Sequence, residues 1–166
     1  MEQQPANTPT NQQRFNVYES YFREYMTARL YRNVFNFICF VQVILGSAFM
    51  AEIASGWLAG LVSTVLTAYI FVYNPGEIAG AAKKQATRYE NVLHHMDSLT
   101  SEELSDTVSR LADTDSPVPE LLIDAAYINA DTAINDLSER TVELKKRLTI
   151  PERIAIFLSG CIIKTP

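Results

Sequence analysis

Two apolar stretches, VFNFICFVQVILGSAFMA at residues 34–51 and WLAGLVSTVLTAYIFVY at residues 57–73, decide the fold of this chain. Each is close to the ~20 apolar residues that a helix needs to cross a hydrocarbon core of ~30 Å. Between residues 33 and 76 the only charged side chain is Glu52, which lies in the short connector between the stretches. That connector allows only a tight antiparallel turn. The sequence therefore predicts an all-α membrane protein with a two-helix transmembrane hairpin at residues 33–76.

Insertion of both stretches into lipid is energetically favourable. Leu, Ile, Phe and Val dominate them, and each such residue contributes about −0.3 to −0.6 kcal/mol near the centre of a span. Against them stand only Asn36 and Gln42 in the first stretch, and hydroxyl side chains in the second. The alternative is a hairpin buried in a soluble helical bundle. Such helices normally show a polar face at helical period, and neither stretch does.

The charges that flank the hairpin predict its orientation. Lys and Arg lie on the two outer sides of the hairpin, and the connector contains none. Because cytoplasmic loops are enriched in Lys and Arg, we expect both termini in the cytoplasm, with Glu52 on the opposite side of a bacterial inner membrane. The flanking residues are Arg14, Arg23, Arg29, Arg32, Lys83, Lys84 and Arg88.

The length of 166 residues leaves room for one modest soluble domain beside the hairpin. The chain has a net charge of −5, and residues 77–166 are rich in Asp and Glu. An acidic cytoplasmic part argues against nucleic acid as a partner, because phosphate backbones are bound by clustered Lys and Arg. Cys39 and Cys161 are expected to be unpaired thiols, since the cytoplasm is reducing. Residues 1–30 lack the apolar core of a cleavable signal peptide.

Residues 1–32 are predicted to form a disordered start followed by an amphipathic juxtamembrane helix. Residues 1–13 are rich in Gln, Asn, Thr and Pro, a composition typical of disorder. Beyond them, aromatic residues recur at spacings of three and four, on one helical face. Aromatic rings beside arginines suit a helix at the membrane interface, but the same face can instead pack on the cytoplasmic domain. The aromatic residues are Phe15, Tyr18, Phe22 and Tyr25.

Residues 77–148 are predicted to form a cytoplasmic module of helices. Capping residues mark three helix starts, at residues 74–77, 100–103 and 149–152. The helix over residues 77–96 is expected to bury a face that includes Ala82, Tyr89 and Met96. Residues 149–166 are predicted to form a short apolar C-terminal helix that packs on the module or lies against the membrane.

The longest helical repeat in this module runs from Ile123 to Leu148. Its residues recur at alternating spacings of four and three, the pattern of a coiled-coil or bundle seam. We expect one long helix that pairs within the chain or between chains. The seam consists of Ile123, Tyr127, Ala130, Ile134, Leu137, Thr141, Leu144 and Leu148.

Polar side chains within the spans are the first candidates for a functional site. A polar group inside a membrane helix is costly and usually faces a bundle interior or a water path. Gln42 falls near mid-membrane, so we expect it to line a conduction path or to bond between protomers. The alternative is that Gln42 bonds Ser63 or Thr64 across the hairpin. The pore-lining or interprotomer candidates are Gln42, Cys39, Gly46, Ser63, Thr64 and Thr67.

Small residues recur at every fourth position of the second span, in two rows. One row runs through residues 55, 59, 63 and 67, and the other through residues 56, 60, 64 and 68. Such rows let helix backbones approach closely in lipid and favour association. One row can serve the hairpin itself, which leaves the other for a neighbouring protomer in a homo-oligomer.

The sequence contains no recognisable catalytic motif. It contains no Gly-rich phosphate loop, no nucleophile motif and no Cys/His metal spacing. His94 and His95 are adjacent, so on a helix they point about 100° apart. Even with Glu90 and Asp97 nearby, they are more typical of a solvated helix end than of a metal site. We therefore expect no catalytic residue, no metal and no cofactor.

Several segments together resemble the SLATT superfamily, the two-transmembrane effector proteins associated with SMODS nucleotidyltransferases and SLOG sensors. The resemblance covers residues 15–148. Its parts are an aromatic pre-helix, a tight hairpin, a following helix with Ala and basic residues at 79–88, SEEL at 101–104, a Pro-containing turn at 117–119 and AYINA at 126–130.

This resemblance implies a homo-oligomeric pore-forming effector of a bacterial or phage conflict system, which permeabilises the inner membrane in antiphage defence or abortive infection. Because the chain shows no fused sensor domain, the trigger is expected to be a separate protein or a ligand. The main alternative is a non-conducting membrane adaptor or phage exclusion protein that recruits partners through its acidic helices. A holin-like lysis protein is a further alternative, although holins more often carry short charged tails.

Overall fold

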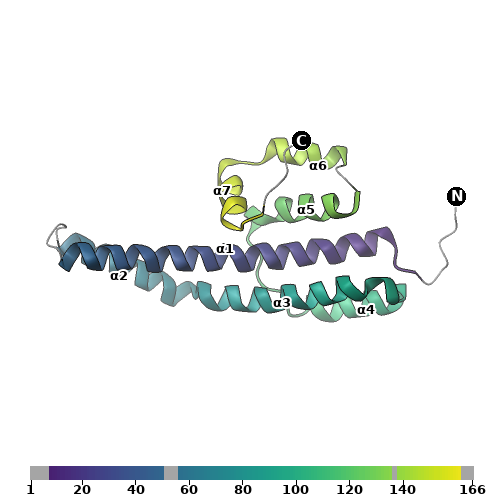
Figure 1. Cartoon of the computed structure of the whole chain (residues 1–166), viewed down its shortest axis with the longest axis horizontal. Coiled ribbons are helices and arrows are strands. Elements are labelled where there is room, and N and C mark those ends of the chain that lie inside the picture. The colour runs from purple at the N-terminus through teal and green to yellow at the C-terminus, as the bar shows by residue number, and fades with distance from the viewer. Residues whose placement is uncertain (1–7, 51–55, 136–137, 162–166) are drawn as a thin grey trace.

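The computed structural model describes residues 8–50, 56–135 and 138–161, and every regular element in these ranges is a helix. The prediction of an all-α chain is therefore confirmed. Two short 3-10 helices, η1 and η2, join longer helices, and Figure 1 shows how the seven α-helices of the described residues are arranged. The elements in chain order are α1 (Asn11–Met50), α2 (Gly56–Tyr73), α3 (Pro75–His95), η1 (Met96–Ser98), α4 (Ser101–Ala112), η2 (Glu120–Leu122), α5 (Ile123–Asn135), α6 (Glu139–Arg147) and α7 (Ile150–Leu158).

The helix α1 is the axis of the molecule. Its 40 residues make a rod of about 60 Å at a rise of 1.5 Å per residue. Its C-terminal half pairs with α2 and its N-terminal half pairs with α3 (Figure 1). The predicted boundary between residues 32 and 33 lies inside this helix, so the predicted juxtamembrane helix and the predicted first span are one continuous element.

The second long element is α2 followed directly by α3. Pro75 occupies the first turn of α3, where its missing N–H costs nothing. Asn74 precedes it in the left-handed region, with φ of 44°, a conformation that Asn tolerates better than most residues. The Asn74 amide donates to the Glu77 carboxylate at 2.6 Å. The predicted helix start at residues 74–77 is thus present, but the Asn74 side chain bonds Glu77 rather than capping backbone N–H groups.

The hairpin consists of residues 33–50 of α1 together with α2. These two helices are long and apolar enough to cross a membrane, with mean hydropathies of 1.3 and 1.6 in their most apolar windows. Only 11% and 6% of those windows are buried inside the molecule. A core helix of a soluble protein would be mostly buried, so this hairpin is not the interior of the folded chain. Its exposed large side chains include Phe37, Phe40, Val43, Trp57, Leu61, Val65 and Phe71.

The helical module consists of the N-terminal half of α1 with α3 to α7, and its core has two parts on opposite sides of α1. One part joins α1 to α3 and α4 through Val17, Tyr89 and Leu104, which are 0% exposed. The other joins α1 to η2, α5 and α7, and contains Met26, Leu122, Ala125, Ala126, Ala155 and Ile156. Burial of one such large side chain contributes roughly 1.5–3 kcal/mol.

The aromatic face of α1 therefore packs on the helical module, as one of the two sequence interpretations proposed. Tyr18 lies against the part of the core that contains Tyr89. Phe22 and Tyr25 lie against the part that contains Met26. The predicted apolar face of α3 is confirmed, because Ala82, Tyr89 and Met96 are all buried.

The prediction of one long helix from Ile123 to Leu148 is wrong. The chain forms α5, turns at Ser138 and returns as α6 (Figure 1). Along α5 the fully buried positions are Ala125, Ala126, Ile128 and Ala130, of which only Ala130 belongs to the predicted seam, whereas Ile123 is 38% exposed. The repeat identified Ala130 and Thr141 as buried, but a spacing of three and four residues continues across a turn and so could not show that α5 and α6 are separate helices.

The other seam positions are divided between α5 and α6. Tyr127, Ile134, Leu144 and Leu148 are half-buried, and Thr141 is buried. Leu137 lies outside the described residues.

The helix starts predicted from capping boxes are confirmed for α4 and α7. The Glu103 carboxylate accepts from the Thr100 backbone N–H at 2.9 Å, and the Glu152 carboxylate accepts from that of Thr149 at 2.6 Å. On α7, Ala155 and Ile156 are buried, whereas Ile150, Ile154 and Phe157 are exposed. One face of α7 thus packs on the module and the other is free.

Candidate functional site

The polar pair Gln42 and Thr67 joins the two helices of the hairpin. The Gln42 side-chain amide donates to the Thr67 hydroxyl at 2.9 Å. That hydroxyl donates in turn to the backbone carbonyl of Ser63 at 2.9 Å. Gln42 therefore bonds across the hairpin, as one sequence interpretation proposed, but its partner is Thr67 rather than Ser63 or Thr64. In lipid such a bond is worth about 0.6–1 kcal/mol.

The other predicted pore-lining residues lie partly between the two helices of the hairpin and partly on its outer surface. Cys39 and Ser63 are half-buried. Gly46 is exposed, and a Cβ at its position would have open space around it. Thr64 is also exposed and donates to the Gly60 carbonyl of its own helix at 2.8 Å. The structure therefore brings together Gln42, Ser63 and Thr67, and it leaves Gly46 and Thr64 on the outer surface.

The two rows of small residues on α2 also lie on different sides of the hairpin. Ala59 is 6% exposed and Ser63 is half-buried, and Thr67 of the same row is exposed but bonds Gln42 of α1, so this row lies on the side of α2 that faces α1. In the second row Gly56 is half-buried, whereas Gly60, Thr64 and Ala68 are exposed. A Cβ added at Gly60 would meet no neighbour within 4 Å, as at Gly46. The chain itself thus uses one small row and leaves the other uncovered.

Glu24 is a functional candidate that the sequence reasoning missed. Its side chain is 1% exposed, and its Oε1 accepts from the Ser116 backbone N–H at 2.6 Å. Nearby, the Tyr89 hydroxyl donates to Asp115 at 2.9 Å. Burial raises the pKa of Glu24 to about 7, and the charge of Asp115 adds to this, although the bond from Ser116 acts in the opposite direction. The sequence did contain one indication that Glu24 is buried: it follows Val17 by seven residues, and residues seven apart lie on the same face of a helix.

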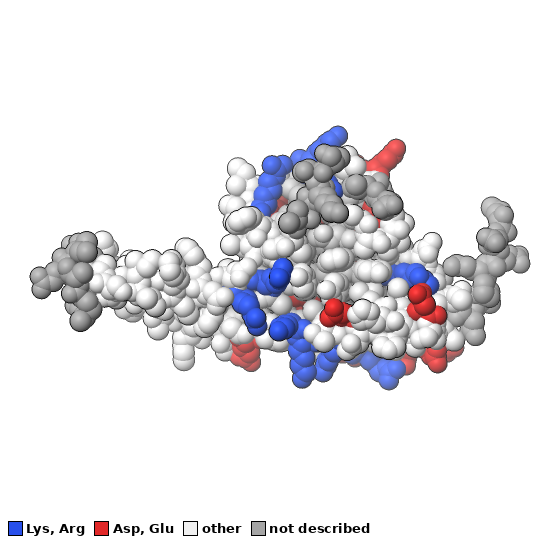
Figure 2. Space-filling view, viewed as in Figure 1, with Lys and Arg blue, Asp and Glu red and all other residues white. Residues whose placement is uncertain are grey.

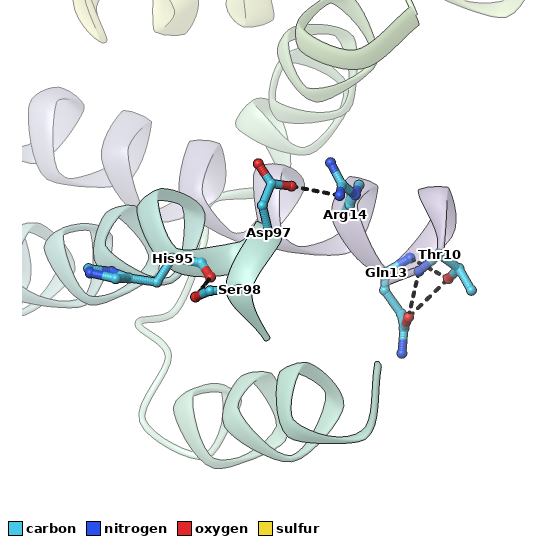
Figure 3. Close-up of polar contacts among 6 residues, drawn as sticks. All are labelled: Thr10, Gln13, Arg14, His95, Asp97 and Ser98. Atoms are coloured by element: carbon cyan, nitrogen blue, oxygen red, sulfur yellow. Dashed lines mark hydrogen bonds and ion pairs between the residues drawn. The ribbon is translucent and has the colours of Figure 1, made fainter. Parts of the chain in front are cut away.

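The histidine pair and its acidic neighbours do not converge. The His95 ring lies 2.8 Å from the Asn91 carbonyl. Asp97 instead forms an ion pair with Arg14 at 2.6 Å, and Figure 3 shows the His95 ring directed away from it. The Gln13 side chain, drawn in the same figure, accepts from the Thr10 backbone N–H at 2.8 Å and so helps to start α1. Among the described residues, no group of three His, Cys, Asp or Glu side chains is placed to hold a metal ion.

Comparison with known proteins adds no relative: the chain matches no family model, no curated protein and no solved structure.

Proposed function

We propose that this chain is a homo-oligomeric, pore-forming effector of a bacterial or phage conflict system that acts in the inner membrane. The observation that carries this proposal is the uncovered row of small residues on α2, formed by Gly60, Thr64 and Ala68. Two helices cannot enclose a pore, so conduction requires several copies of the hairpin. The uncovered row is the place where a second α2 backbone can approach most closely.

The continuous helices give such an effector a route for control. The helix α1 runs from the core of the helical module into the hairpin, and α3 follows α2 directly at Asn74. A movement of the module is therefore transmitted to both spans. In this proposal both termini are cytoplasmic, and a separate sensor protein or ligand acts on the module, as the resemblance to the SLATT superfamily implies.

The test of assembly is cysteine cross-linking in membranes. In a background with Cys39→Ser and Cys161→Ser, Thr64→Cys should form disulfide-linked dimers on mild oxidation. Val65→Cys is the matched control, because Val65 is 60% exposed and points about 100° away on the same helix. Equal cross-linking at both positions, or none at Thr64→Cys, would contradict the proposed contact.

The test of conduction is potassium release from liposomes that contain the purified chain. The wild-type oligomer should release potassium, and Thr64→Leu should reduce release because the larger side chain separates the helices. An oligomer that inserts fully and still leaves the liposomes sealed would contradict pore formation by this chain alone.

A non-conducting adaptor is the second candidate, and one observation favours it. The bond between Gln42 and Thr67 satisfies these side chains within a single hairpin, so they need no water path. In this case the exposed carboxylates of α4, such as Glu102 and Asp106, would recruit partners. Sealed liposomes together with retained cross-linking at Thr64→Cys would be the signature of the adaptor.

A further inference from the structure

A cleft of about 560 Å³ lies where the helical module meets the hairpin. Its walls come from α1, from α3 and from Gly160 at the C-terminal end of α7. Its volume falls within the range of ~300–1,000 Å³ that is usual for sites of small molecules. The side chains that give it chemical character are Tyr21, Tyr25, Arg29, Arg32, Lys83 and Glu90.

The cleft has an excess of positive charge. Arg29, Arg32 and Lys83 line it together with a single carboxylate, that of Glu90. Within the part of the chain that the structure describes, none of the three cations forms an ion pair. Figure 2 shows Lys and Arg side chains gathered beside the white hairpin. Convergent cations without partner anions repel one another, so an anion that enters the cleft gains from all three.

Local contacts hold Arg29 in place at the wall. Its guanidinium lies over the ring of Tyr25, 5.0 Å from the ring centroid. Gly160 adopts a φ of +65°, and a Cβ at that position would lie 2.9 Å from the Arg29 guanidinium nitrogen. The backbone at Gly160 therefore lies directly against the end of the Arg29 side chain. These contacts place the planar fork of N–H donors of Arg29 at the wall of the cleft.

The position of the cleft along the molecule indicates where its ligand comes from. Arg32 lies directly before residue 33, where the hairpin begins, and Lys83 follows Pro75 by about two helical turns. A long cationic side chain at the end of a span, such as that of Arg32, reaches the level of the lipid headgroups. Basic pockets at this level bind phosphate-bearing headgroups.

We propose that this cleft is a binding site for a phosphate group, carried either by the headgroup of an anionic phospholipid or by a small soluble phosphate ester. Arg29 and Arg32 supply forks that match two phosphate oxygens each, and Lys83 supplies a third positive charge. The phospholipid source rests on the proposed membrane hairpin, whereas the soluble source does not. A ligand here contacts both α1 and α3, the two helices that continue into the spans.

The experiment is native mass spectrometry of the full chain in detergent micelles. One arm adds dioctanoyl phosphatidylglycerol, with dioctanoyl phosphatidylcholine as the lipid without net charge. The other arm adds adenosine monophosphate or inorganic phosphate. The test variant is Arg32→Gln with Lys83→Gln. The matched control is Lys84→Gln with Lys146→Gln, which removes the same charge from exposed positions that do not line the cleft.

The wild type should bind an anionic probe in at least one arm. The test variant should bind that probe about tenfold more weakly or worse, because charge-assisted hydrogen bonds are lost, whereas the control should change by less than about threefold. Arg29→Lys keeps the positive charge but removes the planar pair of N–H donors, so it should also weaken binding of the anionic probe. Melting temperatures establish that each variant is folded.

The arm of the experiment in which binding is lost in the test variant identifies whether the phosphate belongs to a lipid or to a soluble ligand. Phosphatidylglycerol adducts that disappear in the test variant support a lipid ligand, and loss of nucleotide or phosphate binding supports a soluble one. Failure of the wild type to bind any anionic probe would overturn the site, as would equal losses in test and control variants. Binding is measured in detergent and without conduction, so this result is independent of whether the chain forms a pore.

Discussion

At the scale of single residues, Glu24 makes the stability of the molecule depend on pH. Its pKa is raised from 4.5 to about 7 by burial, and the groups that face it are Asp115 and Tyr89. The folded chain therefore holds a proton that the unfolded chain releases above pH 4.5. This contribution to stability is fully present below pH 4.5 and is lost as the pH rises through about 7, at roughly 1.4 kcal/mol per pH unit.

Glu24→Gln should remove this dependence. The glutamine carbonyl can still accept from the Ser116 N–H, and no buried charge forms at high pH. We expect the free energy of unfolding of the wild type to fall by about 3 kcal/mol between pH 4.5 and 7, and that of the variant to stay nearly flat. Denaturant titrations at several pH values measure both slopes. Parallel slopes in the two proteins would contradict the assignment to Glu24.

The pair Gln42 and Thr67 is suited to a double-mutant cycle. Gln42→Leu and Thr67→Val each remove one side of the 2.9 Å bond, and the double variant removes both. We expect a coupling energy of about 0.6–1 kcal/mol in detergent, since bonds between spans are modest. Coupling near zero would indicate that Gln42 has another partner, such as a second protomer. Gln42→Leu should leave the oligomer intact if the bond is only internal.

At the scale of elements, Asp131 holds the turn between α5 and α6. Its carboxylate accepts from the hydroxyls of Ser138 and Thr141 and from the Asn135 amide at 3.0 Å. Burial acts to raise the pKa of Asp131, but these hydrogen bonds outweigh it and lower the pKa below 3.8. The ionised form is therefore the one that stabilises the fold, above pH 3.8, and this contribution is lost as the pH falls through the depressed pKa.

Asp131→Ala should lower the free energy of unfolding by about 1–3 kcal/mol, because the buried Thr141 hydroxyl and the half-buried Ser138 hydroxyl lose their acceptor. The control is Asp106→Ala, which removes only an exposed ion pair to Arg110 worth less than about 1 kcal/mol. Denaturant unfolding at neutral pH measures both changes. An effect of Asp131→Ala as small as that of the control would mean that the turn does not depend on this carboxylate.

The contact of α5 with α1 depends on alanine. Ala125, Ala126 and Ala130 are 0% exposed, so the two helices approach closely without room for larger side chains. Ala126→Leu should destabilise the module by about 1–3 kcal/mol through overpacking. Ala133→Leu, on the exposed face of the same helix, should have little effect. Thermal unfolding compares the two, and similar melting temperatures would contradict the observed orientation of α5.

At the scale of the whole molecule, topology is the property to test first. We expect both termini in the cytoplasm because Lys and Arg flank the hairpin and are missing from its connector. In a background without native cysteines, Ser55→Cys should react with an impermeant maleimide from outside the cell, and Ser98→Cys should react only after lysis. Ser55 lies outside the described residues and is chosen from the sequence. The opposite labelling pattern would reverse the proposed orientation.

Features that depend on near neighbours could be predicted from the amino-acid sequence alone. The length and apolarity of two stretches predict the hairpin, and the residue types at positions 100–103 and 149–152 predict two helix starts, because these signals lie within a few residues. The folded molecule was needed to learn that Gln42 meets Thr67, that Glu24 is buried beside Ser116, and where α5 ends. It was also needed to learn that cations from α1 and α3 share one cleft with the end of α7. These contacts join residues far apart in the chain, and the packing register of whole helices sets them rather than any local preference.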